Sequence, residues 1–110
     1  MNVPFAHIVF FTLKDHSPEE RTEFAECCNK YLSGHPGTVY FSVAIQSEND
    51  REVNDRDFDV ALHLVFRDRH AQDEYQTAPR HLDFIRECSD RWESVRVFDS
   101  LVVGQQISAD

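Results

Sequence analysis

The chain has 110 residues, enough for one domain around one hydrophobic core and too few for a second. Hydrophobic residues make up 41% of it, with only 3 Gly and 4 Pro, a composition typical of a folded globular protein. The net charge of −9, from 11 basic and 20 acidic residues, argues against nucleic acid as a partner, because a phosphate-binding surface needs clustered Lys and Arg.

Membrane insertion and secretion are also disfavoured. No stretch reaches the ~18 consecutive apolar residues that span a bilayer, and the first seven residues lack the basic start and apolar run of a signal peptide. Cys27 and Cys28 are adjacent and Cys88 is distant, which fits neither a disulfide framework nor a zinc site. We therefore expect a cytoplasmic protein whose cysteines are small buried hydrophobic residues.

The first predicted elements are a strand and an amphipathic helix. Residues 5–13 alternate as a strand with two apolar faces: Phe5, His7, Val9, Phe11 and Leu13 on one, Ala6, Ile8, Phe10 and Thr12 on the other. Ser17 then caps a helix, with Pro18 in its first turn and Glu20 completing a capping box. The helix carries one apolar stripe of Phe24, Cys27, Cys28, Tyr31 and Leu32, and it ends at the turn residues 34–37.

Two further strands enclose a polar segment. Residues 38–45 predict a strand with Val39, Phe41, Val43 and Ile45 on one face. Residues 46–57 are rich in charge and predict an exposed loop. Residues 58–66 predict the clearest strand, with Phe58, Val60, Leu62, Leu64 and Phe66 on one face and Asp59, Ala61, His63 and Val65 on the other.

The C-terminal part predicts a broken helix and a last strand. Asp68 caps a helical segment that runs to about Thr77, and Pro79 interrupts it. A second segment follows with Leu82, Ile85, Cys88 and Ser89 in helical register, and residues 93–103 alternate as the last strand. The domain therefore covers residues 1–110, with a core of about 5–103.

The element order β-α-β-β-α-β predicts an α+β, ferredoxin-like fold: a four-stranded antiparallel sheet with the helices on one face. The helices cover one face only, yet the first and third strands are apolar on both. Because each large apolar side chain left in water costs ~1.5–3 kcal/mol, we expect the second face to pack against a second copy. The expected partner is the chain itself, in a homodimer through the sheet faces.

Several motifs resemble one family. They are residues 7–11 (HIVFF), residues 58–62 (FDVAL) before Val65 and Phe66, the run Tyr75, Pro79-Arg80-His81 and Phe84, and residues 95–99 (VRVFD). Together they resemble the stress-responsive A/B-barrel domain family, a branch of the dimeric α/β-barrel proteins, over roughly residues 5 to 100. Ala44 departs from the pattern, since a Gly is expected at the end of the second strand.

The resemblance implies a homodimer with a pocket between each sheet and its helices. Most members of the family have no assigned reaction. One plant member is a polyketide cyclase that uses neither metal nor organic cofactor; its catalytic Tyr and His correspond to Tyr75 and His81, and a first-strand His corresponds to His7. The wider superfamily includes cofactor-free monooxygenases, heme-degrading and chlorite-dismutating enzymes and decyclising isomerases, so fold does not choose a reaction.

Tyr75 and His81 suit enolate chemistry if their side chains meet. On an unbroken helix, residues six apart diverge by ~120°, but the break at Pro79 can re-aim the second segment. A His then takes a proton from an activated carbon while a Tyr hydroxyl donates to the carbonyl oxygen. The alternative is structural: Tyr75 is a boundary aromatic and His81 caps the second segment.

The expected ligand pocket is apolar and aromatic, lined by His7, Val9, Phe11, Phe24, Tyr31 and Phe84. His7 has an equally good alternative as a core residue bonded to backbone. His63 alternates against the main apolar face and is expected at the dimer interface. His16, His35 and His70 lie at loops or helix ends and are expected at the surface.

We expect no metal and no organic cofactor. No His, Cys or carboxylate pattern has metal-ligand spacing, and glycine-rich phosphate loops are missing from the sequence. Some relatives hold a cation with backbone carbonyls in the turn after the first helix, here near Leu32, His35 and Thr38. Carbonyl ligation leaves no side-chain pattern to recognise.

Two functions remain open from the sequence. The first is a small-molecule protein whose pocket binds an apolar or aromatic ligand, with cofactor-free acid/base activity from Tyr75 and His81. The second is a non-catalytic stress or assembly protein whose own Phe and Leu side chains fill that space. A pocket of ~300 Å³ or more beside His81 favours the first.

Overall fold

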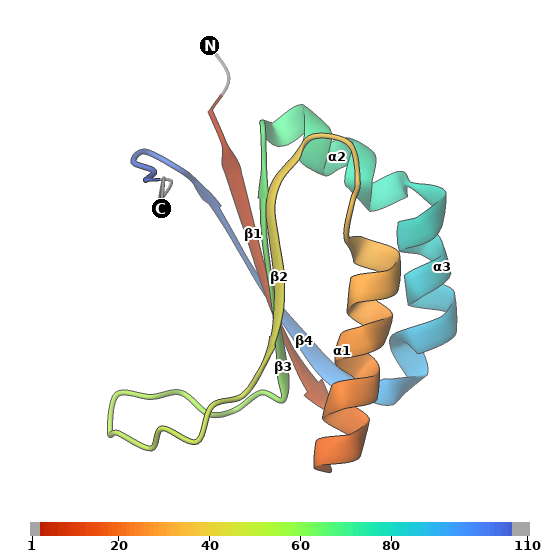
Figure 1. Ribbon diagram of the computed structural model, residues 1–110, viewed down its shortest axis with the longest axis vertical. Coiled ribbons are helices and arrows are strands. Elements are labelled where there is room, and N and C mark those ends of the chain that lie inside the picture. The colour runs from red at the N-terminus through yellow and green to blue at the C-terminus, as the bar shows by residue number, and fades with distance from the viewer. Residues whose placement is uncertain (1–2, 107–110) are drawn as a thin grey trace.

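The computed structural model describes residues 3–106, which form one sheet and one layer of helices (Figure 1). The elements in order are β1 (Phe5–Leu13), α1 (Pro18–Leu32), β2 (Thr38–Ile45), β3 (Val60–Phe66), α2 (Arg69–Thr77), α3 (Pro79–Cys88), the 3₁₀ turn η1 (Ser89–Arg91) and β4 (Trp92–Leu101). The break predicted at Pro79 divides two separate helices. The expected fold class is confirmed, with the order written more fully as β-α-β-β-α-α-β.

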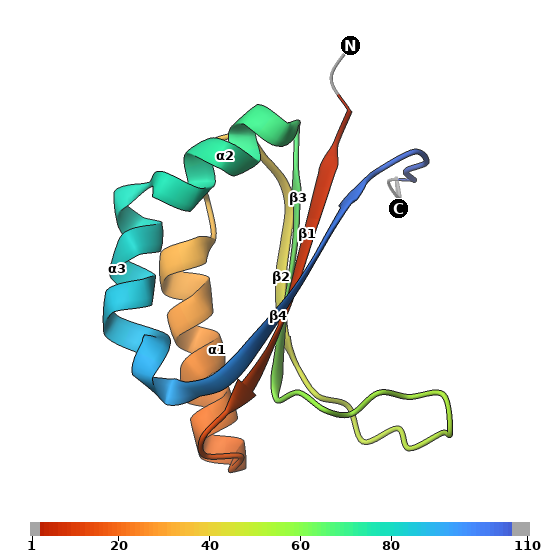
Figure 2. The ribbon, with the colours of Figure 1, turned by 180° about the vertical axis from the view of Figure 1, so that it is seen from behind.

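The four strands form one antiparallel sheet in the order β2-β3-β1-β4. Helices α1, α2 and α3 pack on the same face of this sheet, and within residues 3–106 no helix or strand covers the opposite face (Figures 1 and 2). The loop between β2 and β3 extends away from the helices. The central pair, β1 and β3, therefore supplies most of the core.

The N-terminus of α1 is capped as predicted, but only on one side. The Ser17 hydroxyl accepts a hydrogen bond from the Glu20 backbone N–H, and Pro18 occupies the first turn. The Glu20 carboxylate does not return to the cap; it accepts hydrogen bonds from Arg91 instead. The reciprocal half of the capping box is thus replaced by an ion pair that joins α1 to the start of β4.

The core lies between the sheet and the helices and is dominated by aromatic rings. The ring of Phe11 in β1 lies 4.9 Å from Phe24 of α1, and Trp92 lies 5.3 Å from Phe11 and 5.7 Å from Phe84 of α3. These are edge-on or tilted contacts, the arrangements that aromatic quadrupoles favour. The cluster fixes the distance between the helix layer and the sheet at this end.

β3 begins later than the alternation predicts. The strand starts at Val60, not Phe58, because Asp59 and Val60 are both buried and the two-residue period fails there. Phe58 was expected beside Val60, but its ring packs 5.0 Å from Phe10 of β1, on the opposite face. The buried carboxylate of Asp59 explains the change, since it turns inward to accept the Leu13 N–H.

The faces of β2 and α3 also differ in part from prediction. In β2, Phe41 and Val43 pack on the core, whereas Val39 and Ile45 are exposed. The register shifts between Thr38 and Tyr40, which removes Val39 from the buried face. Ala44 pairs regularly with Ala61, so its place in the strand does not require a Gly.

In α3, the buried residues are Phe84 and Cys88, while Leu82 and Ile85 are 50% and 40% exposed. Leu82, Ile85 and Cys88 were predicted to share the buried face of this helix, and only Cys88 is buried. The last strand, expected over 93–103, is Trp92–Leu101.

The outer face of the sheet is apolar, as the sequence predicts. Ile8 and Phe10 of β1 lie opposite Phe98 and Arg96 of β4, and the Phe10 and Phe98 rings are 5.8 Å apart. Phe98 is 53% exposed, and His63 lies on the same face, next to Tyr40. No helix covers this surface (Figure 2).

Candidate functional site

The α2–α3 break brings the rings of Tyr75 and His81 into contact. Pro79 forces the preceding Ala78 into extended backbone, with φ −63° and ψ 141°, so α2 stops at Thr77 and α3 starts in a new direction. The ring centroids of Tyr75 and His81 then lie 4.7 Å apart with an interplanar angle of 67°. The two side chains thus lie together, not on diverging faces.

His7 reaches the same place from the sheet. In β1 it lies directly opposite Asp99 of β4, and its Nδ1 is 2.6 Å from the Asp99 carboxylate. Since a carboxylate only accepts, Nδ1 carries the proton and the ring orientation is set by the strand register. The ring of His7 is 6.0 Å from that of Tyr75, which places both histidines beside the phenol.

These residues line a cavity of about 250 Å³ between the sheet and α2–α3. Of the expected pocket residues, His7, Val9, Phe11 and Phe84 line it, together with Tyr75 and His81. Further lining residues are Leu32, Leu62, Gln76, Ile85, Trp92, Val95, Val97 and Asp99. The exposed residues Ile85 and Val97 are among them, so the cavity opens along β4, where no helix covers the sheet edge.

Phe24 and Tyr31, expected in the pocket, do not line this cavity. Phe24 is fully buried in the aromatic cluster, behind Phe11 and Phe84. Tyr31 turns outward, where its hydroxyl donates to the Glu87 carboxylate. The apolar stripe on α1 predicted that both residues face inward. Helical spacing alone does not distinguish a residue of the packed core from one that lines a cavity.

Burial shifts the pKa values of the two candidate acid/base groups in opposite directions. It lowers the pKa of His81 below its ordinary 6.5, and the neighbouring His35 and His7 lower it further. It raises the pKa of the Tyr75 phenol well above 10. At neutral pH the imidazole is therefore a neutral acceptor and the phenol remains a hydrogen-bond donor.

His81 and His7 are held differently. His7 is fixed by Asp99, whereas His81 Nδ1 is buried with no hydrogen-bond partner among residues 3–106. A neutral imidazole without a protein partner can take either tautomer. No protein partner therefore fixes the tautomer of His81, whereas His7 has one nitrogen committed to Asp99.

His35 is a member of this cluster that sequence reasoning placed at the surface. It is only 6% exposed, its Nε2 lies 2.8 Å from the Tyr31 carbonyl oxygen, and its ring is 4.9 Å from that of Tyr75. The last carbonyls of a helix need donors, and a His between Gly34 and Pro36 in the following turn is one such donor. The place of His35 directly after the helix was the sequence feature from which its burial could have been predicted.

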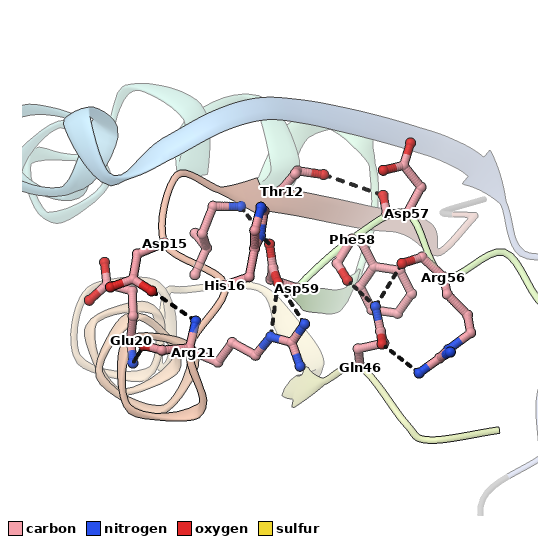
Figure 3. Close-up of polar contacts among 12 residues, drawn as sticks. Thr12, Asp15, His16, Glu20, Arg21, Gln46, Arg56, Asp57, Phe58 and Asp59 are labelled. Atoms are coloured by element: carbon pink, nitrogen blue, oxygen red, sulfur yellow. Dashed lines mark hydrogen bonds and ion pairs between the residues drawn. The ribbon is translucent and has the colours of Figure 1, made fainter. Parts of the chain in front are cut away.

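A second polar cluster lies at the opposite end of the sheet and was not predicted. The buried Asp59 carboxylate accepts hydrogen bonds from the Leu13 N–H at 2.7 Å, from His16 at 2.9 Å and from Arg21 at 2.8 Å (Figure 3). Burial alone would raise its pKa, but these donors outweigh burial and lower it. Asp59 therefore joins the end of β1, the start of α1 and the start of β3.

The side chains do not assemble a metal site. Within residues 3–106, no three His, Cys, Asp or Glu residues are grouped as metal ligands. In the turn where relatives hold a cation, the His35 carbonyl already accepts the Thr38 N–H at 3.1 Å. No helix in the described part of the chain is long and apolar enough to cross a membrane.

The cysteines are free thiols with structural surroundings. Cys28 and Cys88 are buried and Cys27 is half-buried between α1 and α3. Burial raises the pKa of Cys28 far above its ordinary value and that of Cys88 to about 12, so both remain protonated thiols. A protonated thiol is a poor nucleophile, which agrees with their expected role as small core residues.

A four-stranded antiparallel sheet with helices on one face and a cavity beneath them defines the class: a ferredoxin-like α+β protein. A family model described as "Stress responsive A/B Barrel Domain" matches residues 5–102. The chain belongs to this family, as its motifs indicated. Among proteins of curated function, none matches the sequence significantly.

Solved structures share this fold. A family protein with a ferredoxin-like fold from Mesorhizobium loti is 25% identical, with a TM-score of 0.77 over 94% of this chain and 100% of that chain. A dimeric ferredoxin-like protein of unknown function from Thermobifida fusca is 14% identical, with a TM-score of 0.75 over 93% of each chain. A hydroxynitrile lyase from Passiflora edulis is 18% identical, with a TM-score of 0.73 over 94% of this chain and 97% of that chain.

Proposed function

We propose that this protein binds a small apolar or aromatic carbonyl compound in the cavity beneath α2 and α3, and acts on it by cofactor-free acid/base chemistry. The observation that carries the proposal is the contact between the Tyr75 and His81 rings, 4.7 Å apart at the wall of that cavity. His81 is the candidate base and Tyr75 the candidate donor. His7, held by Asp99, is a second imidazole at the same site.

The chemistry follows from the protonation states. A neutral His81 can accept a proton from a carbon next to a carbonyl, and charge then develops on the carbonyl oxygen. The protonated phenol of Tyr75 can donate a hydrogen bond to that oxygen. The apolar lining from Val9, Phe11 and Phe84 suits an aliphatic or aromatic body for the ligand.

The alternative, a non-catalytic protein with a filled core, is less well supported. Phe11, Phe24 and Phe84 fill one end of the space between sheet and helices, but about 250 Å³ remains open beside His81. This volume falls short of the ~300 Å³ set above as favouring a ligand pocket, so the proposal is supported by the contact of the Tyr75 and His81 rings and not by the volume. We therefore favour a small ligand over a large one.

The proposal includes a homodimer formed through the outer sheet face. That face carries Ile8, Phe10 and Phe98 without a covering element, and a structural neighbour is described as dimeric. Burial of these side chains against a second copy removes their cost of exposure to water. The proposal also includes a cytoplasmic location, since three free thiols suit a reducing compartment.

The test is a proton-abstraction assay joined to a binding assay. Aromatic β-diketones and β-keto acids are incubated with the protein in D₂O, and loss of the α-proton is followed by NMR, while thermal shift reports binding. We expect exchange above the buffer rate, reduced ~10²–10⁴-fold by His81→Ala and by Tyr75→Phe. The matched controls are His70→Ala and Tyr31→Phe, which alter an exposed and a half-buried side chain that do not line the cavity.

The outcomes separate binding from catalysis. Exchange at the buffer rate with every compound, although the protein binds some of them, would contradict acid/base activity and favour a binding protein. No thermal shift across the panel, for wild type and His81→Ala alike, would contradict the ligand proposal itself.

A further inference from the structure

A second cavity lies beside Tyr75, between the α1–β2 turn and the α2–α3 junction. Its volume is about 360 Å³, and it is lined by His35, Pro36, Glu74, Tyr75, Thr77, Ala78 and Pro79. The turn between α1 and β2 supplies one wall and the α2–α3 junction the other, and the two segments lie side by side in Figures 1 and 2. Tyr75 belongs to the walls of both cavities.

His35 lines this cavity and has one ring nitrogen bonded to backbone. Its Nε2 lies 2.8 Å from the Tyr31 carbonyl oxygen, which can only accept, so Nε2 carries the proton. With that proton on Nε2, Nδ1 is the remaining ring nitrogen, and no hydrogen bond to Nδ1 occurs among residues 3–106. His35 is only 6% exposed, so packing against its neighbours fixes the position of its ring.

The remaining polar groups of the wall also accept. Glu74 contributes a carboxylate, of which Oε1 lies 2.5 Å from His70 Nε2 and Oε2 is the second acceptor. The Thr77 hydroxyl donates to the Glu74 backbone carbonyl, which uses its only proton. None of the described residues that line the cavity is Lys or Arg.

Three lining residues offer no free backbone donor. Pro36 and Pro79 have no N–H, and the N–H of Ala78 is used by the Tyr75 carbonyl at 3.2 Å. A cavity with an imidazole nitrogen and a carboxylate in its wall, and with no Lys or Arg among its described lining residues, complements a molecule that brings its own donors. The apolar surfaces of Pro36, Ala78 and Pro79 suit a short hydrocarbon body.

We propose that the cavity beside Tyr75 is a second binding site, for a small organic cation with an ammonium group. The ammonium donates to His35 Nδ1 and to the Glu74 carboxylate, and its aliphatic part lies against Pro36 and Pro79. The Tyr75 ring adds an aromatic wall of the kind that cations approach. The net charge of −9 raises the local concentration of such cations.

The experiment compares n-butylammonium with butyrate and butyramide, three probes of similar length that differ in charge and donors. Binding to the full chain is followed by NMR at the amides of residues 74–78 and the His35 ring. We expect saturable shifts with n-butylammonium, with a Kd on the order of millimolar for so few atoms. Butyrate is expected to cause no shift.

Two variants locate the site. Glu74→Gln removes one exposed charge, and His35→Phe removes the buried ring nitrogens while keeping a ring. Each variant is expected to weaken n-butylammonium binding about tenfold, as loss of a hydrogen bond to a charged group does. Glu52→Gln, in the exposed loop of residues 46–57, is the matched control for charge. Because Glu74 is exposed, its variant keeps the test valid if His35→Phe fails to fold.

Three results would overturn the inference. They are equal shifts with butyrate and n-butylammonium, equal weakening by Glu74→Gln and Glu52→Gln, and saturable shifts confined to residues outside 35–36 and 74–79. His81→Ala separates this inference from the proposed function. It removes activity in the first cavity but leaves n-butylammonium binding in the second unchanged.

Discussion

The ring of Tyr75 lies 4.7 Å from that of His81, although six residues separate them in the sequence. An uninterrupted helix would turn the two side chains apart by ~120°. The extended Ala78 between α2 and α3 removes that divergence and directs both rings at one cavity. Pro79 is therefore the residue on which the candidate site depends.

The titration of His81 tests its surroundings directly. Because burial and the neighbouring His35 and His7 lower its pKa, the Cε1 proton of His81 should titrate below pH 6.5 in NMR. The neutral form is the one favoured on folding, so its contribution to stability is complete above the unfolded pKa of about 6.5 and is lost as pH falls through the folded pKa. A pKa of 6.5 or above for His81 would contradict the assignment.

Removal of the Asp59 carboxylate should destabilise the fold strongly. Asp59→Ala leaves the buried Leu13 N–H and the Arg21 guanidinium without their acceptor, and we expect a loss of about 3 kcal/mol in the free energy of unfolding. Urea unfolding measures it, with the neighbouring exposed Asp57→Ala as control. Equal stability of the two variants would show that the cluster is not structural.

The same carboxylate predicts acid sensitivity. Its pKa is lowered from 3.8, so the stabilisation is present above pH ~4 and is lost as pH falls through the lower folded pKa. Wild type should therefore lose stability below pH ~4 more steeply than Asp59→Ala. Parallel pH–stability curves for the two proteins would contradict the lowered pKa.

The outer sheet face should control assembly. Phe98→Asp places a charge on the exposed apolar face beside Phe10, and we expect it to raise the dimer dissociation constant at least ~30-fold. Sedimentation at micromolar concentration measures the shift to monomer. Leu82→Asp is the control, since Leu82 is similarly exposed but lies on α3. A wild-type monomer, or dissociation by Leu82→Asp alone, would exclude this face as the interface.

The turn beside the second cavity requires Gly37 for two reasons. Its φ is +82°, and a Cβ there would lie 2.5 Å from Cβ of Ala71 in α2. Gly34 has φ +73° but open space around it. Gly34→Ala should cost about 1–2 kcal/mol for the left-handed backbone, and Gly37→Ala should cost more because of the clash. Thermal unfolding of both variants measures the difference.

Local periodicity was sufficient for the element order and for much of the fold. The two-residue alternation of residues 5–13 predicted β1 with its correct limits, and Pro79 predicted the division of the last helix. The two apolar faces of β1 also predicted an uncovered sheet surface. These features depend on near neighbours in the chain, for which backbone geometry and the pattern of apolar residues are sufficient.

Only the tertiary structure decided which residues share the site. His7 meets Asp99, and His35 meets Tyr75, through contacts between segments 92 and 40 residues apart. Asp59 is buried because donors from two other elements converge on it. Phe24 lies in the packed core and Tyr31 is half-buried, so neither lines the cavity. Such outcomes depend on packing distance and on the satisfaction of buried polar groups, neither of which is encoded in the spacing of residue types along the chain.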